Sequence, residues 1–185
     1  MCACARWASG RTGESFDMAT SFVALRALCY MAAYILVFGW LASRTQSFDR
    51  NLNIPLPDWI RIVGVFLGVI GAVVAFACAG IFVARGRGTP AIFDPPREFV
   101  ATGPYKVVRN PMYIGGLILL TGFGLYRGSI AILFFTIVMF FLFHLYVVFL
   151  EEPGLQARFG ESYIAYKRSV HRWIPKFSRA AHAAF

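Results

Sequence analysis

Apolar residues gather in four long runs, at 20–43, 59–84, 112–126 and 129–150. A transmembrane helix needs about 20 consecutive, mostly apolar residues, so this pattern predicts four spans. The third run is too short to cross about 30 Å of hydrocarbon alone, so we expect either that its flanks extend it or that it forms a tight helical hairpin with the fourth run. The turn Tyr-Arg-Gly-Ser at 126–129 has room for such a hairpin and for nothing more.

Both ends of the chain carry a different pattern. Residues 1–18 are rich in Gly, Ser and charged residues, and we expect a disordered tail. After the fourth run, Gly160 can end a short helix, and a second helix begins near Glu161. Tyr163, Tyr166 and Val170 recur there at helical spacing with basic residues on the other faces, which predicts an amphipathic helix at the membrane surface.

The predicted fold is therefore all-α and polytopic. A transmembrane domain at 19–150 has four helices and contains a loop at 85–110, and a segment at 151–185 forms interfacial helices. The composition agrees, because 58% of the 185 residues are hydrophobic and 15% are charged. The mean hydropathy of +0.63 is too high for one small soluble core.

The net charge of +9 indicates an orientation. Lys and Arg concentrate at 85–109 and after residue 150, and by the positive-inside rule we expect both regions, and both termini, to be cytoplasmic. These charges flank the spans and form no separate domain, which argues against binding to nucleic acid.

The four cysteines give neither a disulfide framework nor paired metal-ligand spacing, so we expect no metal. The first apolar run is too long for a signal peptide and has no small-residue cleavage site close behind it.

The first candidate site is the stretch GPYKVVRNPMYIGG at 103–116. Asn110 is a preferred N-cap and Pro111 a preferred first helical residue, so a helix begins there with free N–H groups and a partial positive charge. Arg109 can grip a carboxylate or phosphate, while Tyr105 and Tyr113 supply aromatic faces and hydroxyls. An ordinary helix cap beside interfacial tyrosines would give the same pattern.

The second candidate site lies at the foot of the fourth run. His144 precedes Glu151 and Glu152 by seven and eight positions, so in a regular α-helix the three share roughly one face. Adjacent acids below a hydrocarbon run are costly if they face lipid, so we expect at least one to point into a cavity. Two solvated acids at a helix end are the simpler alternative.

Together the two sites predict a pocket at the cytoplasmic interface, with the C-terminal helix as a lid. Its cations, carboxylates and tyrosines suit a ligand that bears a carboxylate, an amine, an aromatic base and ribose hydroxyls. S-adenosylmethionine is such a ligand, and carboxylates and aromatic faces can favour its sulfonium.

These blocks, GPYKVVRNPMYIGG and FHLYVVFLEEPGLQARFGESYIAYKRSVHRWIP, resemble the signature blocks of the integral-membrane methyltransferases that include isoprenylcysteine carboxyl methyltransferase and phosphatidylethanolamine N-methyltransferase. The resemblance covers about 95–175 and implies a multi-span helical fold, an S-adenosylmethionine pocket made by both blocks, and an opening to the bilayer for a lipophilic acceptor. The implied cofactor-binding positions are Tyr105, Arg109, Asn110, Pro111, Tyr113, Gly115, Glu151, Glu152, Tyr163 and Tyr166. The first half of the chain shows no such resemblance, and we expect it to select the acceptor.

Methyl transfer needs few catalytic groups, because a sulfonium is already an activated leaving group. A carboxylate acceptor, as in a prenylcysteine, would need only orientation by Arg109 or a neighbour. A phospholipid amine would have to lose a proton to Glu151, Glu152 or His144. Two alternatives stay open: an NADPH-dependent membrane reductase, since the sterol reductases look similar in this half, and a non-enzymatic membrane scaffold or lipid-binding protein.

Overall fold

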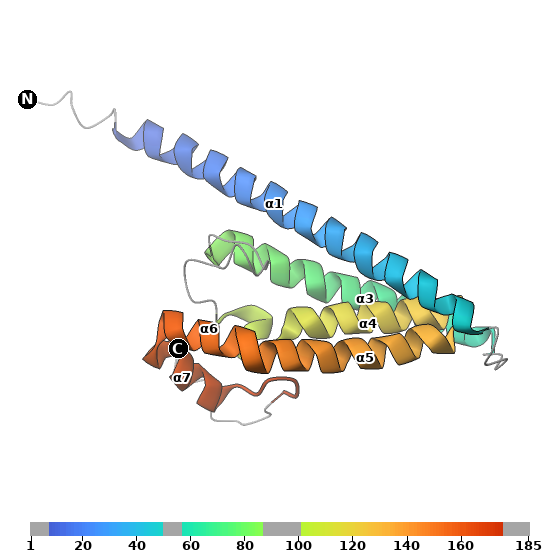
Figure 1. The fold of residues 1–185 in the computed structure, drawn as a ribbon. Helices are drawn as coiled ribbons and strands as arrows, with labels where there is room; N and C mark the ends of the chain where they lie inside the picture. The colour runs from blue at the N-terminus through green and yellow to red at the C-terminus, as the bar shows by residue number, and fades with distance from the viewer. Residues whose placement is uncertain (1–7, 50–56, 87–100, 176–185) are drawn as a thin grey trace, which may run out of the picture.

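The computed structural model describes residues 8–49, 57–86 and 101–175, and this part of the chain is helical with no β-strand (Figure 1). Four helices run back and forth: α1 (Ala8–Thr45), α3 (Trp59–Ile81), α4 (Pro111–Arg127) and α5 (Ile130–Tyr146). Two short helices, α6 (Glu152–Phe159) and α7 (Glu161–Ser169), follow at the end where α4 begins. The predicted all-α architecture is confirmed for these residues.

Short 3-10 and π turns complete the chain path. The 3-10 turns are η1 (Gln46–Phe48) and η3 (Gly103–Lys106), and the π turns are η2 (Phe82–Gly86) and η4 (Val147–Glu151). Helix α1 includes part of the segment 1–18 that the sequence pattern left without structure, while residues 1–7 lie outside the described residues. Most of the loop predicted at 85–110 also lies outside them.

Among the described residues, three helices are long and apolar enough to cross a membrane: Ser21–Phe48, Trp59–Ala84 and Ile130–Phe159. Many of their large apolar side chains are exposed, among them Leu36, Phe66, Phe134 and Phe149, as expected for surfaces that face lipid. With 17 residues, α4 is about 25 Å long, shorter than the hydrocarbon core of about 30 Å.

Helices α3 and α4 share the most extensive contact in the fold, which glycines make possible. A Cβ on Gly64 would lie 2.5 Å from the Tyr126 backbone nitrogen, and one on Gly115 would lie 2.9 Å from that of Ala75. Because no side chain separates the backbones, α4 lies directly against α3, as small residues allow in membrane proteins.

The tight hairpin between the third and fourth runs is confirmed. Gly128 adopts a left-handed conformation with φ of 62° and ends α4, and the Ser129 hydroxyl caps α5 by accepting from the Ile132 nitrogen at 3.1 Å. Asp49, beyond the end of α1, accepts from the Ala131 nitrogen at 2.9 Å. The hairpin therefore returns the chain to the end where α4 began, which brings the two candidate blocks together.

Candidate functional site

The C-terminal segment after α7 lies along the loop that leads into α4. The backbone nitrogen of Arg109 donates to the backbone carbonyl of His171 at 2.9 Å, and the side-chain amide of Asn110 donates to the backbone carbonyl of Arg172 at 3.3 Å. From α7, the buried Tyr166 hydroxyl donates to the Tyr105 carbonyl at 2.6 Å. These bonds join residues about sixty positions apart and fix the two blocks as one unit.

Glu152 is the centre of a charge cluster. Its Oε1 lies 3.0 Å from an Arg109 guanidinium nitrogen and 2.7 Å from Arg172 Nε, and its Oε2 lies 3.0 Å from Arg172 Nη2 and 3.6 Å from Lys167 Nζ. Glu152 is only 6% exposed, so water does little to stabilise its charge. The neighbouring cations provide that stabilisation instead. The hydrogen bonds to Glu152 also raise the pKa of Arg172 above its usual value.

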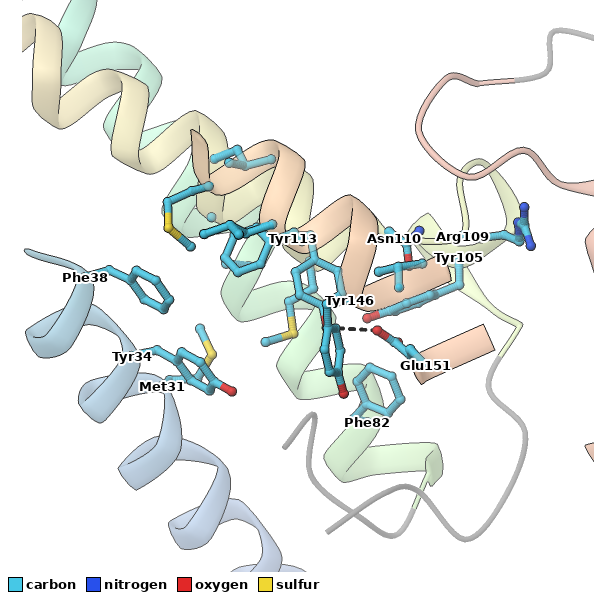
Figure 2. A pocket seen from close by; sticks show the side chains of 18 of the residues that line it. Met31, Tyr34, Phe38, Phe82, Tyr105, Arg109, Asn110, Tyr113, Tyr146 and Glu151 are labelled. Carbon is cyan, nitrogen blue, oxygen red and sulfur yellow. Dashed lines mark hydrogen bonds between the residues drawn. The ribbon is translucent and has the colours of Figure 1, made fainter. Parts of the chain in front are cut away.

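Glu151 has different surroundings although it is the next residue in the chain. The Tyr113 hydroxyl donates to its Oε2 at 2.8 Å. Figure 2 shows the carboxylate pointing in among the side chains of Tyr105, Tyr113, Tyr146 and Phe82. Among the described residues no cation forms an ion pair with it.

A cavity of about 810 Å³ connects these residues with the membrane-spanning helices. Its polar end is lined by Tyr105, Arg109, Asn110, Tyr113, Glu151, Glu152, Tyr163 and Tyr166. Its apolar end is lined by side chains of α1, α4 and α5, including Met31, Ile35, Phe38, Leu120 and Met139. The volume falls in the range of ligand-binding pockets, about 300–1,000 Å³.

Two predicted positions at the start of α4 do not line this cavity. Pro111 is buried at the first helical position, and Gly115 packs against the backbone of α3. Asn110 occupies the N-cap position, but its side chain makes no capping hydrogen bond and contacts the C-terminal segment instead. The N-terminal N–H groups of α4 are therefore not capped by this side chain.

His144 does not line the cavity either. The Trp173 indole donates to His144 Nδ1 at 3.0 Å, and the imidazole stacks on Phe140 with ring centroids 6.3 Å apart. The expectation that His144 shares a face with Glu151 and Glu152 assumed a regular α-helix. The π turn Val147–Glu151 accommodates one extra residue. The side chains after it are therefore rotated about the helix axis by about 100° relative to a regular α-helix.

Burial keeps three tyrosines of the polar end protonated. It raises the pKa of Tyr163 to about 12, and it raises the pKa values of Tyr105 and Tyr166 above the ordinary tyrosine value. These hydroxyls therefore remain hydrogen-bond donors throughout the physiological pH range.

Arg109 has capacity left for a ligand. Its side chain is 11% exposed and pairs with Glu152, yet its Nε has no hydrogen-bond partner among the described residues. An unsatisfied guanidinium N–H near an uncapped helix N-terminus fits an anionic group such as a carboxylate. The aromatic rings and the Glu151 carboxylate fit the cationic and aromatic parts of a zwitterionic ligand.

Sequence reasoning missed several residues at or near this cavity. Met31, Tyr34 and Phe38 come from α1, in which the sequence pattern singled out no individual site residue, and Phe82 and Tyr146 come from the ends of apolar runs. Arg172 and Trp173 hold the C-terminal segment in place. A tyrosine within an apolar run, as at Tyr34 and Tyr146, was the available signal, because its hydroxyl needs a polar partner or a cavity.

Comparison with known proteins gives one positive finding. A sequence model of the phospholipid methyltransferase family matches residues 59–162, from α3 into α7. The matched part contains Arg109, Tyr113, Glu151 and Glu152, whereas α1 precedes it and Arg172 follows it. A search of curated proteins found no match.

Proposed function

Because the chain belongs to the phospholipid methyltransferase family, we propose that it transfers a methyl group from S-adenosylmethionine to a lipid acceptor dissolved in the membrane. The observation that carries this proposal is a cavity of about 810 Å³ that has both a charged, aromatic end and an apolar end. A water-soluble methyl donor fits the first end and an acyl or prenyl chain fits the second.

The cofactor is assigned to the polar end. Arg109 and the N-terminus of α4 would hold its carboxylate, and Tyr105, Asn110, Tyr113, Glu151, Glu152, Tyr163 and Tyr166 would line the remainder. When bound, the cofactor supplies an electrophilic methyl group on a positively charged sulfur. The protein then has to align the acceptor and exclude water, which can lower the barrier by about 7–11 kcal/mol.

The lipid acceptor is assigned to the apolar end. This part of the cavity is lined by Ile35 and Phe38 of α1, Leu120 of α4 and Met139 of α5. Phe38 also packs against the cluster that contains Leu120 and Met139. Since α1 lies outside the segment that matches the family, its side chains are where this protein can differ from its relatives in acceptor choice.

The orientation in the membrane follows from the charge distribution. We assign α4 as a fourth span, and we place the cofactor end on the cytoplasmic side with both termini. The cations around Glu152 and the basic residues of α7 lie at this end, as the positive-inside rule requires. In this orientation α6, α7 and 170–175 lie at the interface and close the site.

Two measurements on protein purified in detergent test the proposal. Calorimetry should show binding of S-adenosylmethionine and of S-adenosylhomocysteine but not of NADPH, and Arg109→Ala should weaken both by about tenfold or more. Incubation with methyl-labelled S-adenosylmethionine and a total lipid extract should label a lipid fraction. Binding of NADPH alone would point to a membrane reductase, and absence of binding to either cofactor would point to a scaffold or lipid-binding protein.

A further inference from the structure

The apolar end of the cavity is closed on the side away from the cofactor end. The last lining residue of α4 is Phe123, and the first lining residue of α5 is Met139. Beyond them, Ala42 of α1 and Ile132 of α5 are fully buried in one apolar cluster, which includes Met139 and against which Phe123 packs. This cluster forms an end wall, so the cavity is a blind pocket in this direction.

Hydrogen bonds hold α1 in place beside the end wall. The Arg127 guanidinium donates to the side-chain oxygen of Gln46, and Asp49 accepts from the backbone nitrogen of Ala131 at 2.9 Å. Both bonds join the end of α1 to the hairpin between α4 and α5, at the opposite end of the fold from α6 and α7 (Figure 1). A chain that extends from the cofactor end therefore meets a wall that is tied from two sides.

The depth of the apolar end corresponds to one leaflet of a bilayer. Tyr113 lines the cavity beside the cofactor end, and Phe123 lines it ten residues further along α4. At 1.5 Å per residue the two positions are about 15 Å apart along the helix axis, which is half of a hydrocarbon core of about 30 Å. One extended lipid chain of the leaflet at the cofactor end fits this length, and a longer chain reaches the end wall.

Gly39 is the last residue of α1 that lines the cavity. Glycine weakens the interior of a helix, so its presence there usually has a packing reason. Gly64 and Gly71 have such a reason, because a Cβ on either would lie 2.5 Å or 2.4 Å from the backbone of α4. A Cβ on Gly39 would meet nothing within 4 Å. The missing side chain of Gly39 therefore leaves space at the far end of the cavity and does not serve contact between helices.

We propose that the apolar end measures the length of one acceptor chain, and that Gly39 is the residue that determines how long a chain is accepted. This inference rests on the proposed function, because it takes the lipid in the cavity to be the methyl acceptor. Each methylene that enters the apolar end adds affinity, and a methylene beyond the end wall adds none. The substrate class is a lipid that places a single chain, no longer than one leaflet, in the cavity.

The first test measures this limit in the wild type. With S-adenosylhomocysteine bound, its affinity is measured for saturated single-chain phospholipids that differ only by successive methylenes, at a constant detergent concentration. Affinity should rise about fourfold with each methylene and stop rising at a definite chain length. A rise that continues to the longest chains would overturn the inference, because it would show that the chain leaves the cavity sideways into the bilayer.

The second test changes the depth of the pocket. Gly39→Leu places a side chain at its far end, so the limit should move to shorter chains, and chains at the wild-type limit should bind about tenfold more weakly or worse. Gly80→Leu is the matched control, because a Cβ there also meets nothing within 4 Å but Gly80 does not line the cavity. Neither glycine has a positive φ, so leucine fits both positions without backbone strain. Met139→Ala shortens the end wall and should move the limit to longer chains.

The outcomes separate this inference from the proposed function. An unchanged limit in Gly39→Leu, or an equal shift in Gly80→Leu, would overturn the role of Gly39 while methyl transfer stands. Binding of the cofactor and labelling of lipid by the wild type test the proposed function independently of chain length. If the wild type neither binds S-adenosylhomocysteine nor labels any lipid, the proposed function fails and the inference about the acceptor fails with it.

Discussion

The Trp173 indole nitrogen donates a 3.0 Å hydrogen bond to His144 Nδ1, across the interface between α5 and the C-terminal segment. The Trp173 ring also packs against Phe140 and Tyr113, with centroids 5.3 Å and 6.5 Å away. Because Tyr113 donates a hydrogen bond to Glu151, this contact links the segment after α7 to the wall of the cavity. It also gives His144 a structural role, since Nδ1 must be unprotonated to accept the bond.

We therefore expect replacement of His144 to change stability and not the chemistry. His144→Phe removes the acceptor of the Trp173 bond and should lower the free energy of unfolding by about 1 kcal/mol. The pH profile of kcat/KM should keep its shape. Loss of one limb of that profile in His144→Phe would contradict the structural role. It would indicate that His144 accepts a proton during the reaction.

Removal of the charge at Glu152 should be far more costly. Glu152→Gln leaves Arg109 and Arg172 without their counter-charge. Breaking a buried pair of this kind lowers the free energy of unfolding by about 3–5 kcal/mol. The partial exposure of Arg172 should make the loss smaller. Unfolding in detergent measures the loss. Lys167→Ala is the matched control, because Lys167 is more exposed and lies 3.6 Å away, so it should cost less than about 1 kcal/mol. Similar losses in both variants would argue against Glu152 as the centre of the cluster.

The glycine contact between α3 and α4 gives a pair of variants with opposite expected effects. In Gly71→Ala the new methyl group would press on the backbone of Leu119 and Gly115, and overpacking of this kind costs about 1–3 kcal/mol. In Gly80→Ala the methyl group meets nothing within 4 Å, and the higher helix propensity of alanine should make the change neutral or stabilising by up to about 1 kcal/mol. Thermal unfolding of the two variants checks the difference.

The α1 wall should control the acceptor and not the cofactor. Ile35→Trp places a larger side chain into the apolar end of the cavity and should raise KM for a long-chain lipid about tenfold, roughly the effect of 1.4 kcal/mol. Affinity for S-adenosylhomocysteine should stay unchanged. Leu36→Trp is the control, because Leu36 is 72% exposed and does not line the cavity. If the two variants behave alike, the acceptor does not bind beside α1.

Alkaline pH should destabilise the fold through the tyrosines outside the spans. In the unfolded chain a tyrosine ionises near pH 10, whereas the pKa of Tyr163 in the folded protein is about 12. The unfolded state therefore binds fewer protons between these values, and the free energy of unfolding falls as the pH rises from about 10 to 12. Denaturation at pH 9 and at pH 11 measures the slope, and Tyr163→Phe should make it shallower. A slope that Tyr163→Phe leaves unchanged would assign the effect to other groups.

The features that could be predicted from the sequence are those set by local rules. The hairpin at Gly128 and the break at Gly160 follow from the conformations that glycine tolerates, and both have positive φ. The association of Arg109 with Glu152 follows from the return of α5 to the start of α4. The helical runs and the family resemblance of 103–116 needed no tertiary information.

The missed features depend on how the helices approach one another. Tyr34 and Phe38 line the cavity because α1 packs against α4 and α5. The sequence of an apolar membrane helix has no polar face, so it does not indicate which side packs against the other helices. The different surroundings of Glu151 and Glu152 depend on the π turn before Glu152. No residue type marks such a turn, so the sequence suggested a shared face with His144 that the structure does not form.

The π turn Val147–Glu151 sets how Glu151 and Glu152 are rotated about the helix axis. If a single residue were deleted within it, α5 would continue regularly into α6 along much the same axis, but Glu151 and Glu152 would turn together by about 100°. The ion cluster and the cavity would then both lose their carboxylates at once. A surface loop would absorb a length change of one residue. Here the same change would act like a simultaneous substitution of both glutamates in the candidate site.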